Sequence, residues 1–289
     1  MSDREEQTLE WPRASEASLE RSLTIGVIMA THNRAATTRR CLESLLRSTP
    51  PKAQWKLFVH DDGSSDGTID DIVSIFPSAV ITRGTGSDYW ARSMATAEEQ
   101  ALQDPSLDSL LWLNDDVIVS SEGLLNLYEA FRRFPSCIAV GVTSDTMGNW
   151  TYGGLRRSGR RPLQVVGLGI TDRVVSCETM HGNAVLMDVK SAHILGGIDG
   201  GYPHAYADID YGLRATRAGI PIIQMAGVVG TCEKLAGPAI PRGILARWRF
   251  FNEPKHSPLK AQVRIAWKFG GPVGATLAAI GFFRRVALP

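Results

Sequence analysis

Few cysteines, little net charge and no long apolar run set the first limits on this sequence. Its four cysteines lie far apart without a C-x-x-C spacing, so free thiols in a reducing cytoplasm are the simplest interpretation. The formal net charge is +1. Whole-chain electrostatics therefore favour no partner, and nucleic acid is not expected. No uninterrupted run of about 20 apolar residues occurs, and the nearest candidate, 269–283, is interrupted by glycine and proline. A membrane-spanning helix is therefore not expected.

The two ends of the chain differ in charge. Residues 1–22 are acidic and polar, which predicts a disordered leader without a signal peptide. From residue 241 onward the sequence has nine lysines and arginines but one acid, Glu253, and aromatic residues lie between them. We expect residues 236–289 to form a helical extension. It suits peripheral attachment to an anionic membrane, on the inner face of the cytoplasmic membrane. Packing on the core, or on a second subunit of a homo-oligomer, is the alternative.

Residues 23–235 have the pattern of one α/β catalytic domain. Up to about residue 142, short apolar runs typical of strands alternate with segments of helical periodicity. The clearest expected elements are strands at 23–29, 57–59, 79–81, 110–113 and 184–187, and helices starting at Thr37 or Thr38 and covering 91–102 and 207–218. This alternation predicts a mixed, mostly parallel sheet flanked by helices. Residues 153–161 suggest a loop or hairpin.

Polar residues follow the first two expected strands. The segments THNR (31–34) and DDGS (61–64) come where the strands end, and in open α/β sheets ligands bind beyond the carboxyl ends of the strands. Asp61 could accept a hydrogen bond from a pyrimidine N3–H, which would distinguish uracil or thymine from cytosine. The alternative is a turn, since Asp, Gly and Ser favour turns for backbone reasons.

A pair of acids follows the apolar strand 110–113. Asp115 and Asp116 are adjacent at its end, and two buried carboxylates are costly unless something compensates their charge. A divalent cation that bridges two phosphates would do so, because Mg²⁺ and Mn²⁺ prefer carboxylate and phosphate oxygens. The alternative is a helix N-cap, at Asp116 or Ser120.

A third acidic cluster begins the expected helix 207–218. Asp208 lies in its first turn and could act in catalysis or cap the helix. Asp210 and Arg214 have i,i+4 spacing, which favours a structural ion pair. Each of the three clusters is a weak signal by itself, whereas their order and spacing together are a strong one.

Taken together, the chain resembles the family 2 glycosyltransferases, which have the GT-A fold. The resemblance extends from about residue 24 to 230 and is carried by four segments: VIMATHNR (27–34), VHDDGSSDGT (59–68), LLWLNDDVIV (110–119) and GNAVLMDVKSAHILGGIDGGYPHAYADIDYGLRATRAG (182–219). The segment GTGSDYWARSMATAEEQAL (84–102) is similar to the family's glycine- and tryptophan-containing loop and helix near the donor diphosphate.

The resemblance implies a role for each matching residue. Asp208 would be the catalytic base, Asp116 the ligand of Mn²⁺ or Mg²⁺, and Asp115 would lie near the donor ribose or sugar. Thr31 and Asp61 would contact the nucleoside. The remaining donor-binding candidates are Asn33, Arg34, Gly63, Trp90, Arg92 and Asn114, and the candidates near the acceptor or in support of it are His204, Tyr206, Asp210 and Arg214.

Two positions depart from the family pattern. The acidic motif usually reads Glu-Asp, but Ala207 precedes Asp208 here, so an acceptor contact from that Glu is absent. Many relatives have a histidine after the last core strand, whereas residues 228–234 contain none. The metal would then be held by Asp116, phosphates and water.

The resemblance implies an inverting transferase that moves a sugar from a UDP- or dTDP-sugar to a hydroxyl of a glycan or lipid-linked acceptor. Assembly of bacterial surface polysaccharide is the expected context. One alternative is a non-catalytic nucleotide-sugar-binding protein with the same fold. Another is a sugar-phosphate nucleotidyltransferase, but this class needs a glycine-rich phosphate loop after the first strand, and ATHNRAATTRR (30–40) has no glycine.

Overall fold

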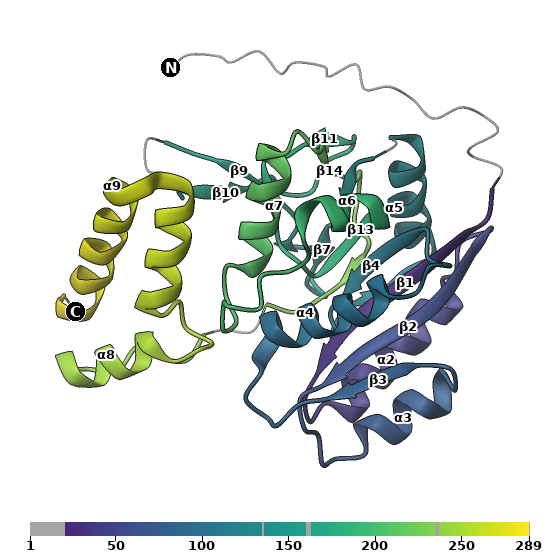
Figure 1. Cartoon of the computed structure of the whole chain (residues 1–289), viewed down its shortest axis with the longest axis horizontal. Helices are drawn as coiled ribbons and strands as arrows, with labels where there is room; N and C mark the ends of the chain where they lie inside the picture. The colour runs from purple at the N-terminus through teal and green to yellow at the C-terminus, as the bar shows by residue number, and fades with distance from the viewer. Residues whose placement is uncertain (1–20, 135, 160–162, 235–236, 289) are drawn as a thin grey trace.

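A mixed eight-stranded sheet forms the centre of the protein (Figure 1). The computed structural model describes residues 21–134, 136–159, 163–234 and 237–288. Within these residues the strand order is β11-β14-β6-β13-β4-β1-β2-β3. Residues 1–20 of the expected leader lie outside the described residues.

The first half of the domain is made of parallel strands and crossover helices, as the sequence predicts. In chain order they are β1 (Leu23–Thr31), α2 (Ala35–Arg47), β2 (Ala53–Asp61), α3 (Thr68–Ile75), β3 (Val80–Arg83), α4 (Tyr89–Leu102) and β4 (Ser109–Leu113). Strands β4, β1, β2 and β3 pair in parallel, and Thr31 is in register with Asp61, which pairs with Arg83. The carboxyl ends of these strands therefore meet at one edge of the sheet.

The second half adds antiparallel strands and two small sheets. Its elements are β5 (Ile118–Val119), α5 (Ser121–Arg133), β6 (Ile138–Val140), β7 (Thr143–Ser144), β8 (Trp150–Tyr152), β9 (Gly154–Arg157), β10 (Val165–Gly167), β11 (Val175–Ser176), β12 (Thr179–Met180), β13 (Ala184–Asp188), α6 (Val189–Leu195), α7 (Ala207–Arg217), β14 (Ile222–Gln224) and β15 (Gly230–Thr231). Strand β13 runs antiparallel to both β4 and β6. The expected hairpin corresponds to β9 and β10, which pair antiparallel.

Apolar residues fill both faces of the main sheet. Along β1, Val27 and Met29 contribute to the core that contains α2, α3 and α5, while Ile28 belongs to the core that contains α4 and α7. Side chains of a strand alternate between its two faces, so a strand covered on both sides must be apolar throughout. This explains why β1 and β4 are continuous apolar runs in the sequence.

The structure corrects the predicted start of one helix, α2, and decides between two predicted caps for another, α5. Helix α2 begins at Ala35, so the prediction of a cap at Thr37 or Thr38 is wrong. Thr38 lies within α2, after its first residues, and therefore cannot cap the helix. Its side chain is fully buried, with its hydroxyl 3.0 Å from that of Thr31. At α5, the amide of Gly123 donates to the Ser120 hydroxyl at 3.1 Å. Ser120 is therefore the cap of α5, and Asp116 does not have that role.

The C-terminal extension consists of α8 (Ile244–Asn252) and α9 (Leu259–Ala287), which lie at the end of the molecule away from α2 and α3 (Figure 1). Helix α9 has two arms because Gly271 has φ 60° and Pro272 follows it, a combination that interrupts a helix. Ala261 and Ile265 of the first arm are buried in the domain core. Among the described residues, no helix combines the length and apolar character needed to cross a bilayer.

Candidate active site

A cavity of about 970 Å³ lies at the edge of the sheet where β1, β2 and β4 end. It brings together residues that lie far apart in the sequence. Of the predicted site residues, Thr31, Arg34, Trp90, Asn114, Asp115, Asp116, His204, Tyr206 and Asp208 line it. The three polar clusters of the sequence therefore contribute to one site.

Other predicted site residues are not among those that line this cavity: Asn33, Asp61, Gly63, Arg92, Asp210 and Arg214. The Asn33 side chain accepts a hydrogen bond from the Ser65 amide at 2.8 Å, and Arg92 pairs with Asp88 at 3.3 Å. Asp61 is fully buried; one carboxylate oxygen accepts from the Ser64 amide at 2.8 Å, and the other has no hydrogen-bond partner among the described residues. These contacts hold the loops that border the cavity.

Arg34 compensates part of the charge of the acid pair. Its guanidinium donates to Oδ1 of Asp115 and to Oδ2 of Asp116, both at 3.0 Å. Burial, together with the charge of Asp116, raises the pKa of Asp115 to about 6 against the lowering effect of Arg34. One guanidinium cannot neutralise two ionised carboxylates, so the pair still attracts a cation.

The acid pair also has oxygen atoms that could hold a metal. Oδ2 of Asp115 is buried and has no hydrogen-bond partner among the described residues, and Oδ1 of Asp116 has only the thiol of Cys232, at 3.5 Å. An unpartnered buried carboxylate oxygen calls for a cation or a donor. The pair therefore fits a hard divalent cation, as the sequence predicts.

Asp208 enters the cavity from the first turn of α7. Its Oδ2 accepts from the Gly182 amide at 3.2 Å, and its Oδ1 accepts from the Ile209 amide at 2.8 Å. Tyr206 occupies the N-cap position without a side-chain cap, so Asp208 is not the cap that the alternative interpretation required. Gly182 permits this arrangement, since a Cβ there would lie 2.8 Å from the Trp90 ring.

Two histidines lie near Asp208, and the lowered pKa of each favours its neutral form. Burial lowers the pKa of His181 and of His204, which outweighs the opposing effect of the Asp208 charge. The Asp208 carboxylate is therefore not paired with an imidazolium. A carboxylate that borders a cavity without a cationic partner can accept a proton from a bound hydroxyl.

The comparisons with known proteins bear on this geometry. Residues 26–187, more than half of the chain, match the family model described as glycosyl transferase family 2. The chain belongs to glycosyl transferase family 2. No curated protein gives a significant match to the sequence.

Solved structures share the fold of this chain at low sequence identity. GalNAc-T7, solved with UDP, GalNAc and Mn²⁺, has a TM-score of 0.56 and 15% identity over 86% of this chain. S. aureus TarS has 0.57 and 13% over 91%. The mannosyltransferase PcManGT from Pyrobaculum calidifontis, solved with GDP-Man and Mn²⁺, has 0.50 and 17% over 94% of this chain and 78% of its own. This chain spans 51% of GalNAc-T7 and 43% of TarS. The fold is GT-A, as expected.

A second group of potential metal ligands lies beside the cavity. Single ligand atoms of His60, Asp62 and Asp88 lie within 4.8 Å of one another. However, the Asp62 carboxylate already accepts from the amides of Gly86, Asp88 and Tyr89 at 2.7 to 3.0 Å. These bonds lower its pKa against the effect of burial. We therefore assign this group to holding the loop before α4, and the acid pair is the stronger metal candidate.

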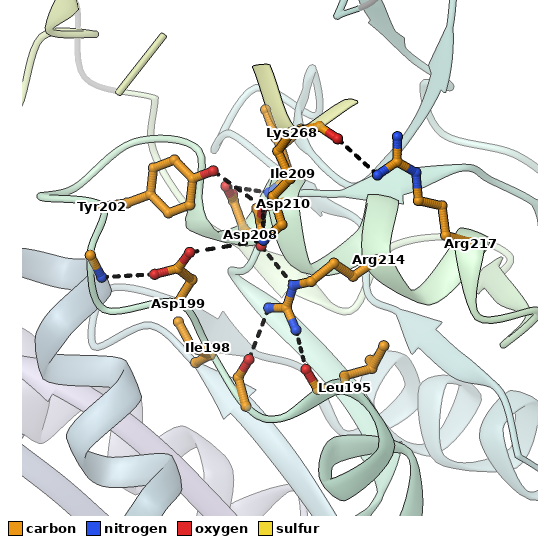
Figure 2. Close-up of polar contacts among 12 residues, drawn as sticks. Leu195, Ile198, Asp199, Tyr202, Asp208, Ile209, Asp210, Arg214, Arg217 and Lys268 are labelled. Carbon is orange, nitrogen blue, oxygen red and sulfur yellow. Dashed lines mark hydrogen bonds and ion pairs between the residues drawn. The ribbon is translucent and has the colours of Figure 1, made fainter. Parts of the chain in front are cut away.

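Asp210 has the structural role that its spacing predicts. It is fully buried, and its carboxylate binds Arg214 and Lys268 at 2.7 Å and the Tyr202 hydroxyl at 3.2 Å (Figure 2). Arg214 also donates to the Gly197 carbonyl at 2.8 Å. Because Lys268 belongs to α9, this network attaches the C-terminal extension to the start of α7, next to Asp208.

Several cavity residues were missed by the sequence analysis. His181 and Asn183 line the cavity, as do Glu253, Pro254, Lys255 and Ser257 between α8 and α9. His32 and Asp62 also line it, and they belong to the polar segments THNR and DDGS that the sequence singles out. The polar HGN at 181–183, between two apolar segments, was a usable signal for two of them. Nothing local indicates that residues 253–257 reach the site, because their approach depends on the contacts that attach α9.

Glu98 gives the protein a predicted pH dependence. Burial raises its pKa from 4.5 to about 7, although the Ile198 amide donates to it at 2.5 Å and opposes the shift. The folded state therefore holds a proton that the unfolded chain releases between these pH values. Stability from the protonated form is complete below pH 4.5 and is lost as pH rises through 7, by roughly 3 kcal/mol.

The test is the difference in the free energy of unfolding between wild type and Glu98→Gln from pH 4.5 to 8. The difference should move in favour of the variant as pH rises. Glu43→Gln, which removes an exposed carboxylate of α2, is the matched control and should give a nearly constant difference. A constant difference for Glu98→Gln would contradict the assigned pKa.

Proposed function

We propose that this family 2 glycosyltransferase transfers a sugar from a UDP- or dTDP-sugar to an acceptor hydroxyl, with inversion at the anomeric carbon and with Mn²⁺ or Mg²⁺. The observation that carries the proposal is that one cavity contains both the acid pair and Asp208, although about 90 residues separate them. A glycan or lipid-linked acceptor and a role in surface polysaccharide assembly are parts of the same proposal.

The residues divide the reaction between two ends of the cavity. Asp115 and Asp116 would hold the cation, which neutralises charge on the leaving diphosphate when it is bound. Asn114 is positioned for the donor by the Trp90 indole, which donates to its side-chain oxygen at 2.7 Å. Asp208 accepts the proton of the attacking hydroxyl, and its bond from Gly182 restrains the carboxylate toward that position.

The donor nucleotide can be identified by ligand-dependent stabilisation. A thermal-shift screen with UDP-, dTDP- and GDP-sugars, each with and without Mn²⁺, should give a metal-dependent shift for a uracil or thymine nucleotide. A ligand at 100 times its Kd stabilises the fold by about 2.7 kcal/mol. A metal-dependent shift with the GDP-sugar alone would contradict the proposed base preference.

Catalysis is tested separately from binding. Release of nucleotide diphosphate from the stabilising donor, measured with Mn²⁺, should exceed the rate without protein and increase with a suitable acceptor. Stabilisation without any release or transfer would favour the non-catalytic sugar-nucleotide-binding protein.

Asp61→Ala tests the base contact. The buried Asp61 oxygen that lacks a partner among the described residues could accept the N3–H of uracil or thymine, since the β1–β2 register puts Asp61 beside Thr31, which lines the cavity. We expect binding of uridine or thymidine diphosphate to weaken by roughly 1–3 kcal/mol, the range for a hydrogen bond to a charged group. Cytidine diphosphate has no N3–H and should lose much less. Calorimetric titrations that give equal losses would assign Asp61 to the turn alone.

A further inference from the structure

The outer surface of α8 and α9 carries an unusual concentration of exposed apolar side chains. Among the described residues, ten of the seventeen exposed large apolar side chains lie between 237 and 288, less than a fifth of the chain. Most of them form two rows, Ile244, Leu245 and Trp248 on α8, and Val273, Leu277, Ile280 and Phe283 on the second arm of α9. We call these seven residues the apolar face.

The two rows belong to one surface. Val273, Leu277 and Ile280 are spaced i, i+4 and i+7, so they share one side of the second arm. Trp248 stacks on Phe283 with ring centroids 5.9 Å apart and also meets Phe282, edge to face, at 5.5 Å. Phe282 is fully buried. These aromatic contacts fix α8 against the second arm of α9, and Trp248 and Phe283 stay partly exposed where the two rows meet.

The apolar face is not needed to attach the extension to the domain. The first arm of α9 supplies that attachment through Lys268 with Asp210 and Arg264 with Asp199, each at 2.7 Å, and through buried Ala261 and Ile265. Val273 and Ile280 of the second arm remain 69% and 52% exposed. Large apolar patches on a protein surface indicate a binding partner.

The charge around the apolar face indicates which partner. Residues 237–288 contain nine lysines and arginines and the single acid Glu253. Arg285 donates to Gln262 at 2.7 Å, whereas Arg284, one turn beyond Ile280, is exposed and has no side-chain partner within the described part of the chain. Apolar side chains next to unpaired basic groups are complementary to a lipid surface with anionic headgroups.

A second copy of this chain fits the same face less well. In a symmetric dimer the same patch lies on both subunits. Contact through this face would therefore bring arginines against arginines without intervening acids. Arginine side chains that are brought close together repel each other unless anions separate them.

We propose that the apolar face of α8 and α9 docks the protein on the surface of an anionic lipid bilayer without crossing it. The docked helices bring the cavity close to the membrane, since residues 253–257 join α8 to α9 and line the cavity. A groove of about 850 Å³ lies between the two arms of α9, and Leu277 and Arg284 line it together with Tyr206. Tyr206 also lines the cavity. The proposal does not depend on the identity of the donor or the base.

Vesicle co-sedimentation of the full chain tests the docking. Vesicles of phosphatidylcholine alone are compared, at low and at high salt, with vesicles that contain about 30% of the anionic lipid phosphatidylglycerol. This anionic fraction gives the vesicles a negative surface potential. Wild type should sediment with the anionic vesicles at low salt. Apparent affinity should fall about tenfold or more at high salt, or when phosphatidylcholine is the only lipid.

Variants of exposed residues separate docking from folding. Val273→Asp combined with Ile280→Asp, and separately Arg284→Glu, should each lower vesicle affinity about tenfold or more. Ile194→Asp, at a 58% exposed position on α6, is the matched control and should bind as wild type does. Thermal melts should be similar for all variants, because the changed side chains are exposed.

Two outcomes would overturn the proposal. Wild type that stays in the supernatant with anionic vesicles at low salt excludes docking. The second outcome comes from sedimentation velocity without vesicles. If the wild type is a dimer and the combined variant Val273→Asp, Ile280→Asp is a monomer, the face is a subunit interface.

Discussion

Asp208→Asn should lower the rate of sugar transfer by about 10²-fold or more, while donor binding stays nearly unchanged. The physical reason is the loss of a proton acceptor at the one carboxylate that α7 directs into the cavity. A 10²-fold decrease corresponds to about 2.7 kcal/mol of transition-state stabilisation. Asparagine keeps the shape of the side chain and an oxygen that can accept from the Gly182 amide, so the fold should keep its thermal stability.

Glu253→Gln is the matched control for this experiment. Glu253 also lines the cavity, but its side chain is 60% exposed and lies near His256. Its loss should change transfer by no more than a few-fold. Transfer by Asp208→Asn within a few-fold of wild type would mean that another group takes the proton.

Asp116→Ala should abolish metal-dependent binding of the donor. Asp116 is one of the two carboxylates that Arg34 joins, and alanine leaves that arginine with Asp115 alone. The resulting one-to-one pair is neutral and no longer attracts a divalent cation. The affinity for nucleotide diphosphate, titrated with and without Mn²⁺, should become the same in both conditions, while the thermal melt stays cooperative.

Asp88→Asn decides between the two candidate metal sites. Asp88 belongs to the group with His60 and Asp62. It is not among the described residues that line the cavity. We expect its metal dependence to match that of wild type. Full metal dependence in Asp116→Ala together with its loss in Asp88→Asn would move the cation to the His60 group.

The sequence predicted much of the sheet because the physical signals for it are local. A strand buried on both faces must be apolar throughout, and β1 and β4 are such runs. The parallel register then brings the ends of neighbouring strands to one edge, so residues directly after β1 and β4 had to approach each other. From the residues alone, ligand-binding side chains were expected after these strands, and the resemblance to the family assigned Thr31, Arg34 and Asp115 to the donor and Asp116 to the metal.

Other features of the site depend on contacts between distant segments. The sequence left the charge of the acid pair to a metal, whereas the fold adds Arg34, 81 residues away from Asp115. It drew attention to Asp61, but the side chain that lines the cavity belongs to Asp62. Asp61 is the last residue of β2 and is fully buried, whereas Asp62 follows the strand, where its carboxylate accepts from the amides of the loop before α4.

The sequence by itself determined the resemblance to the family, five of the eight strands of the main sheet (β1, β2, β3, β4 and β13) and the three polar clusters. The periodicity of a strand or helix and the position of its end depend on residues that are neighbours in the chain, so they can be predicted from the sequence alone. Only the tertiary structure decided that residues 253–257 complete the cavity and that one surface of α8 and α9 stays exposed. Both depend on the buried network of Asp210, Arg214 and Lys268 (Figure 2). In this network Asp210 and Lys268 are 58 positions apart in the sequence. No local preference of the chain specifies an ion pair over that separation.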